Sequence, residues 1–168
     1  MPWRWPTSSP ACAEMASEPF DAEFGTDDPQ VPDNRRGARQ VALQALYWDA
    51  VSPGDAQRAV TELGSRWALS AEVCQFAGQL VAAVVAHRPE LEEMISTTAT
   101  RWPQERMARV DRLILLLGLA EIFHCEGIPT RVSIDEAVEL AKLYGGGPSY
   151  AFVNGVLDAV VRRHGMAL

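Results

Sequence analysis

The residues that most often carry out catalysis lie far apart along this chain. The histidines His87, His124 and His164 are expected near helix ends, where a cationic imidazole suits the helix dipole, and no cysteine or carboxylate motif accompanies them. The three cysteines fit no zinc or disulfide spacing. Since no nucleophile can be paired with a base, the sequence predicts a protein that is not an enzyme and that has no metal site or cofactor.

A cluster of arginines is the strongest candidate for binding. Arg35, Arg36 and Arg39 fall at the expected start of the first helix, where positive charge is disfavoured by the helix dipole. A phosphate-bearing partner would compensate, because the planar guanidinium donates two hydrogen bonds at once. The alternative is a solvated helix terminus that the acidic residues before it neutralise. The residues alone leave these two interpretations equally open.

Two aromatic residues flank a glycine-rich turn near the end of the chain. Residues 145–148 (GGGP) lack the Lys-Ser/Thr of a phosphate-binding loop, so we interpret them as a helix stop followed by a turn. Tyr144 and Phe152 lie on either side of it. Exposed aromatic side chains beside basic groups are suited to stacking on the bases of single-stranded RNA. The alternative for both rings is packing in the core.

The acidity of the chain is concentrated before the arginine cluster. The whole chain has a net charge of −7, and residues 1–34 hold seven acidic residues against one basic residue, which leaves −1 for residues 35–168. Residues 1–34 also contain six prolines and little aliphatic periodicity. They are therefore predicted to be a disordered acidic leader that competes weakly with RNA for the arginines. Residues 35–168 are predicted to be one folded domain.

The elements that must position these side chains are helices. Apolar residues recur at helical spacing from residue 35 onward, and no alternating strand pattern interrupts them. Seven helical segments are predicted, and their expected starts are Arg35, Ser52-Pro53, Ser70, Pro89, Val110, Ser133 and Ser149. The third carries the clearest apolar stripe, from Val73 to Val85, and Ser133 with Glu136 is predicted to form a capping box. The longest apolar run has eight residues, against the roughly 20 that a membrane span needs, so an all-α protein of the cytoplasm is expected.

Several blocks of the sequence resemble the NusB family of bacterial antitermination factors. They are residues 35–47 (RRGARQVALQALY), 110–115 (VDRLIL) with Ile128-Pro129, 134–142 (IDEAVELAK) and 152–158 (FVNGVLD). The blocks follow one another in order from residue 35 to about residue 163. The last two together are the most specific.

The resemblance implies an all-α fold of two three-helix subdomains with a further helix, and no catalysis. It also implies partners: boxA-type nascent RNA, the ribosomal protein NusE and the RNA polymerase antitermination complex, chiefly on ribosomal RNA operons. Mapped onto this chain, the RNA-binding residues are Arg35, Arg36, Arg39, Lys142, Tyr144, Ser149 and Phe152. The residues near the NusE surface are Asp111, Arg112 and Glu121. Asn154 is expected to be a structural hydrogen-bonding residue and Gly155 a close helix contact.

Two positions depart from the family pattern. Leu116 stands where family members often carry arginine, so that position is either core or a changed partner contact. Pro148 stands where an acidic residue often precedes the serine. Two other functions stay open at this point: an accessory domain related to ribosomal RNA cytosine methyltransferases, and a helical adaptor that does not bind RNA. The sequence does not distinguish a monomer from a homodimer.

Overall fold

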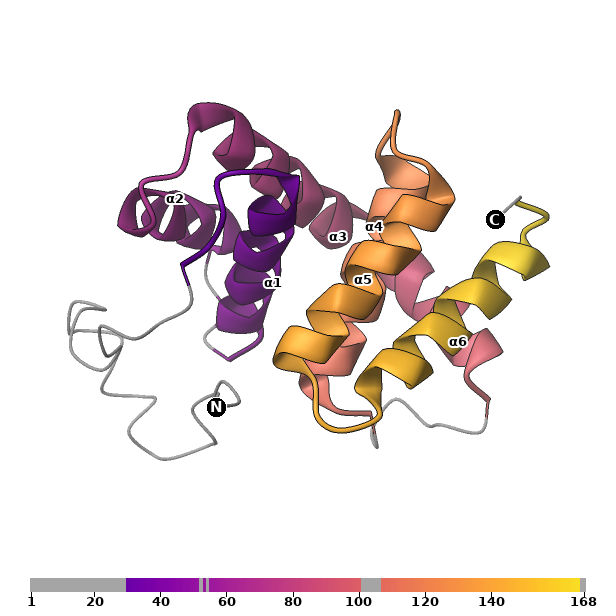
Figure 1. Cartoon of the computed structure of the whole chain (residues 1–168). Coiled ribbons are helices and arrows are strands. Elements are labelled where there is room, and N and C mark those ends of the chain that lie inside the picture. Colours follow the sequence, from indigo (N-terminus) through magenta and orange to yellow (C-terminus); the bar gives the residue numbers. More distant parts are fainter. Residues whose placement is uncertain (1–29, 52, 54, 101–106, 167–168) are drawn as a thin grey trace.

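The computed structural model describes residues 30–51, 53, 55–100 and 107–166. Within these ranges all regular structure is helical (Figure 1). The helices are α1 (Arg35–Val51), α2 (Ala56–Arg66), α3 (Ala71–Thr98), α4 (Arg109–His124), α5 (Thr130–Tyr144) and α6 (Ser149–Arg163). None of them is both long enough and apolar enough to span a membrane.

The six helices form two halves of three. Helices α1, α2 and α3 pack around one another, and so do α4, α5 and α6. The halves meet where α3 and α1 lie against α4 and where α3 reaches α6 (Figure 1). Helix α4 is at the centre, and its residues 113–120 are all buried. The expected all-α arrangement of two three-helix subdomains is confirmed, whereas the further helix is not found among the described residues. Of the two alternatives for Leu116, the structure supports the core position, because this side chain is fully buried.

The expectation of a separate helix after Pro89 is wrong, because α3 continues through the proline to Thr98. A proline inside a helix removes the hydrogen bond to the carbonyl four residues earlier, here that of Val85. Both Pro89 and Val85 are exposed, so water can solvate the unpaired carbonyl. Val85 was predicted to be the last residue of the buried stripe, but it faces solvent and is 54% exposed. The described residues therefore contain one helix where two were predicted.

The helix starts were predicted with mixed success. The hydroxyl of Ser70 accepts from the amide of Val73, as expected for the cap of α3. Helix α2 is capped by Asp55 rather than at Ser52, which lies outside the described residues. The predicted capping box at Ser133 is wrong, because α5 already begins at Thr130. Ser133 is buried inside the helix instead, where its hydroxyl donates to the carboxylate of Glu121 at 2.7 Å.

Residues 30–34 pack on the domain instead of belonging to the predicted leader. Val31 is buried, and the carboxylate of Asp33 accepts from both the amide and the hydroxyl of Ser70, each at 2.8 Å. The carbonyl oxygen of Pro32 lies so close to Gly37 that a Cβ there would be 1.8 Å away. Glycine at position 37 therefore lets this segment cross the first turn of α1. Residues 1–29, the rest of the predicted leader, lie outside the described residues.

Candidate nucleic-acid interface

Helices α1 and α5 run side by side in the same direction (Figure 1). Two pairs of side chains bridge them. Arg36, at the start of α1, donates to Glu136 in the middle of α5, and the amide of Gln44, in the middle of α1, donates to the Tyr144 hydroxyl at the end of α5 over 3.2 Å. We call this line of contacts the α1–α5 seam. Because each pair is eight residues from the other, roughly 12 Å of helix separates them.

The arginine cluster occupies the first end of the α1–α5 seam. The side chain of Asn34 caps α1 by accepting from the amides of Arg36 and Gly37. Arg35 and Arg36 are exposed, and the Arg36 side chain stays 53% exposed although it pairs with Glu136 at 2.9 Å. The hydrogen bond with Glu136 raises the pKa of Arg36, so this side chain is permanently cationic. An open hollow of about 400 Å³ lies here, lined also by the loop at Ile128-Pro129.

Arg39 lies inside the protein rather than on the surface. Its guanidinium donates to both carboxylate oxygens of Glu121 at 2.7 Å, and the two side chains are 6% and 2% exposed. The same guanidinium donates to the carbonyl of Arg35, and Glu136 lies 3.7 Å away. The cluster of Arg39, Glu121 and Ser133 therefore joins α1 to α4 and α5. Sequence reasoning missed it, although a lone glutamate in the apolar α4 was a signal that it needed a buried partner.

The other predicted RNA-binding residues lie near the far end of the α1–α5 seam. Lys142 is half exposed and pairs with Glu139 at 2.7 Å. Tyr144 is only 9% exposed, and the buried Ser149 lies against Gly145 at the start of α6. Phe152 packs partly buried against the core. The exposed ring in this region is that of Tyr150, which is 45% exposed and which sequence reasoning missed.

The predicted partner-binding residues fall into two environments. Asp111 and Arg112 lie in the first turn of α4, and Arg112 pairs there with Glu92 of α3. Asp111 is 9% exposed, and its Oδ1 has no hydrogen-bond partner. Burial raises the pKa of this carboxyl, and a hydrogen bond from Ser149 partly opposes the rise. Glu121 is the buried partner of Arg39, so as placed it is not accessible to another protein.

Two of the family-block residues have surroundings other than those expected. Gly155 has no atom within 4 Å of where a Cβ would lie, so the predicted close helix contact is wrong. Asn154 is exposed, and within the described part of the chain no hydrogen bond of its side chain supports the structural role expected for it. Pro148 precedes α6 directly and accepts at its carbonyl from the amides of Ala151 and Phe152.

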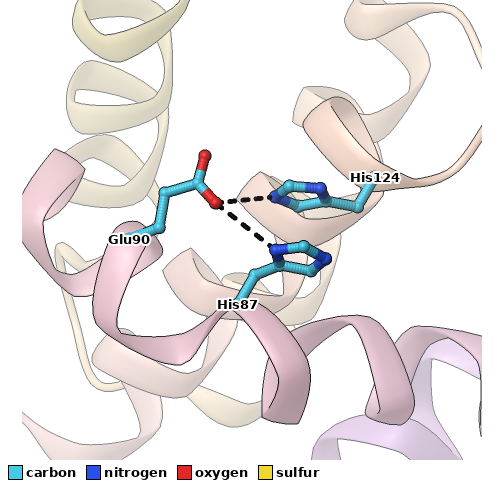
Figure 2. A group of neighbouring side chains, drawn as sticks. All are labelled: His87, Glu90 and His124. Carbon is cyan, nitrogen blue, oxygen red and sulfur yellow. Dashed lines mark ion pairs between the residues drawn. The ribbon is translucent and has the colours of Figure 1, made fainter.

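Two of the three histidines lie together, contrary to the expectation that none has a carboxylate nearby. His87 is in the middle of α3 rather than near its end, and its ring stacks on that of His124, the last residue of α4. Figure 2 shows Glu90 pointing its carboxylate toward both rings. His124 at the end of α4 and His164, which directly follows α6, have the helix-end position predicted for all three, whereas His87 does not.

Comparison with known proteins decides the family of this helical fold. The NusB family model matches residues 36–162. The chain belongs to the NusB family. "Transcription antitermination protein NusB" of Symbiobacterium thermophilum is 42% identical over 137 residues, which cover 77% of this chain and 90% of the relative. The protein of the same name from Dehalococcoides mccartyi strain 195 is 39% identical over 127 residues, covering 76% and 89%.

Solved structures of NusB proteins share the fold of this NusB-family chain. That of T. maritima NusB superposes with a TM-score of 0.72 at 28% identity, covering 77% of this chain and 91% of that one. A crystal structure of the antitermination factors NusB and NusE in complex with dsRNA gives a TM-score of 0.70 at 26% identity, covering 77% and 96%. The expected family is therefore confirmed, and the relatives are named as antitermination proteins rather than enzymes.

Proposed function

We propose that this NusB-family chain is a cytoplasmic transcription antitermination factor. It binds boxA-type RNA together with NusE, within the RNA polymerase antitermination complex, and supports transcription of ribosomal RNA operons. The observation that carries the RNA part is the open hollow at the start of α1, where Arg35 and Arg36 are exposed. The solved complex of NusB and NusE with dsRNA, whose fold this chain shares, supports both partners.

The phosphates of the RNA are expected to lie at the first end of the α1–α5 seam. Arg35 is held over the ring of Phe76, with its guanidinium carbon 5.0 Å from the ring centroid, so it is partly preorganised. Arg36 is oriented by Glu136 but keeps half its surface in water. Arg39 is buried, so it is proposed to act indirectly: its guanidinium donates to the backbone carbonyl of Arg35 and thereby holds Arg35 in place.

The bases are expected to reach the far end of the α1–α5 seam. Lys142 supplies a second positive charge there, and Tyr150 offers an exposed ring for stacking. Tyr144 and Ser149 are buried, so they are proposed to shape the turn between α5 and α6 instead of touching the RNA. Phe152 is partly buried at the edge of this region, and we keep it as a proposed RNA-binding residue.

A fluorescence-anisotropy titration tests the RNA proposal, with boxA-type and scrambled RNA, each with and without NusE. Arg35→Ala and Arg36→Ala should each weaken boxA binding and reduce the salt slope, d log K/d log [salt], by about 0.7. Tyr150→Ala should weaken it by the roughly 1–3 kcal/mol that stacking on one base is worth. Arg58→Ala is the matched control, because Arg58 is an exposed, ion-paired arginine on α2. Equal affinity for both RNAs in the presence of NusE, or equal losses in the control, would contradict the proposal.

The NusE surface is proposed to include Asp111 and Arg112 at the start of α4. The unpaired Oδ1 of Asp111 is a buried acceptor that lies close enough to the surface for a partner's donor to reach it after small adjustments. Asp111→Asn should lower the affinity for NusE in calorimetry and leave RNA affinity without NusE unchanged. Unchanged affinity for NusE would remove Asp111 from this surface.

A further inference from the structure

The His87–Glu90–His124 cluster brings three metal-ligating side chains from two helices to one point (Figure 2). His87 and Glu90 lie one turn apart on α3, so they share a face of that helix. His124 reaches the same point from the end of α4 and stacks its ring on that of His87, with centroids 3.6 Å apart and planes 6° from parallel. The ligand atoms all lie within 4.8 Å of one another.

Hydrogen bonds do not satisfy these atoms. Oε2 of Glu90 lies 3.4 Å from Nδ1 of His87 and 3.6 Å from Nε2 of His124. Both separations exceed the 2.7–3.2 Å or so of an N–H···O bond. Nε2 of His124 is also buried from water and has no hydrogen-bond partner. A buried polar atom without a hydrogen-bond partner is uncommon in a native protein, and this nitrogen is therefore available to coordinate a ligand.

A transition-metal ion has the size that this arrangement needs. Zinc binds imidazole nitrogen and carboxylate oxygen at about 2.0–2.2 Å, and tetrahedral geometry then sets neighbouring ligand atoms roughly 3.3–3.6 Å apart. The two separations from Glu90 match that edge length. The stacked rings must turn away from parallel by rotation about their side-chain bonds so that both lone pairs point at one ion. His87 and Glu90 are partly or largely exposed, which leaves room for this turn.

We propose that His87, Glu90 and His124 bind one divalent transition-metal ion. Two imidazoles and one carboxylate without a thiolate suit Zn²⁺, Ni²⁺ or Cu²⁺ rather than Mg²⁺ or Ca²⁺. Water fills the remaining coordination position on the solvent side. Because α3 and α4 belong to different halves of the protein, the ion ties the two halves together.

Isothermal titration calorimetry of the untagged, chelator-stripped full chain with Zn²⁺ tests this site. One ion should bind per chain. His87→Ala and His124→Ala should each weaken binding by about tenfold or more, because even mutating a residue that only supports a metal ligand costs about 10–100-fold in metal affinity. Glu90→Gln is a third variant, which removes the carboxylate and keeps the size of the side chain. Co²⁺ should give visible absorption bands typical of a four-coordinate ion with nitrogen and oxygen ligands, and the variants should lose them.

Two control variants separate this site from nonspecific binding. His164→Ala removes a histidine whose Nδ1 lies 2.9 Å from the carbonyl of Val160, outside the cluster. Cys125→Ser removes the thiol next in sequence to His124. Both should bind Zn²⁺ with unchanged affinity and stoichiometry. The proposal is overturned if the wild-type chain shows no stoichiometric binding, if His87→Ala binds as tightly as wild type, or if either control loses the site.

Discussion

The buried ion pair between Arg39 and Glu121 provides the sharpest test of how the two halves are held together. Both hydrogen bonds between the side chains are 2.7 Å long, and neither side chain is more than 6% exposed. Glu121→Gln keeps the size of the side chain and removes its charge. The guanidinium of Arg39 then stays buried, and among the described residues the negative charge left beside it is that of Glu136, 3.7 Å from its Nη1.

The size of the effect follows from this geometry. Removing one partner of a buried ion pair costs about 3–5 kcal/mol, because the other charge stays buried without compensation. Since Glu136 compensates in part, we expect the lower end of that range, about 3 kcal/mol. A loss of 1 kcal/mol lowers Tm by about 4–8 °C in domains of about 60–100 residues and by about 2–4 °C in domains of about 150–250 residues. For a domain of intermediate length, the expected loss therefore corresponds to a fall in Tm of roughly 10 °C.

Urea denaturation followed by circular dichroism measures the loss, with the slope m checked for constancy. Glu62→Gln is the matched control. It makes the same chemical change in the Arg58–Glu62 pair, whose 2.8 Å contact is similar but whose side chains are 75% and 51% exposed. An exposed pair contributes about 0–1 kcal/mol. If both variants lose equally little, the reasoning from burial is refuted. Arg39→Met combined with Glu121→Leu should recover most of the stability.

The remaining predictions concern the packed N-terminal segment, the carboxyl at the start of α4 and the acidic leader. Gly37→Ala should lower the free energy of unfolding by about 1–3 kcal/mol, because its Cβ would meet the Pro32 carbonyl. Gly155→Ala has open space around it and should be neutral or stabilising by up to about 1 kcal/mol. Urea denaturation measures both changes. Burial raises the pKa of Asp111, so the folded state is favoured when this carboxyl is protonated and loses that contribution as pH rises. Asp111→Asn should therefore be more stable than wild type at pH 7, and the gain should shrink toward pH 4; a gain that grows on acidification contradicts the sign. Deleting residues 1–29 should tighten RNA binding in low salt by removing nearby negative charge, and an unchanged dissociation constant in anisotropy would count against competition by the leader.

The sequence predicted those features that depend on local patterns. The first turn of arginines, the cap at Ser70 and the helix stop after Tyr144 all follow from a few neighbouring residues. Leu116, which the sequence left as either a core residue or a changed partner contact, is fully buried. Family blocks then related these helices to a function that composition alone did not suggest.

Features that depend on distant residues were not predicted. The pairing of Arg39 with Glu121 joins positions 82 residues apart, and no local pattern connects them. Arg39 was therefore interpreted with its exposed neighbours. His87 stacks on His124 for the same reason. The helix through Pro89 also escaped prediction, because the local cost of proline is offset by packing of α3 against α1 and α4, which only the fold supplies.

The continuous α3 has a consequence for how this protein folds. Its 28 residues make a rod of roughly 42 Å, with one portion packed among α1 and α2 and another against α4 and α6. Neither half can bury its apolar surface without the same rod. The two halves should therefore unfold as a single cooperative unit, and the slowest-exchanging amides should run along α3 and α4 across their boundary rather than cluster in one half.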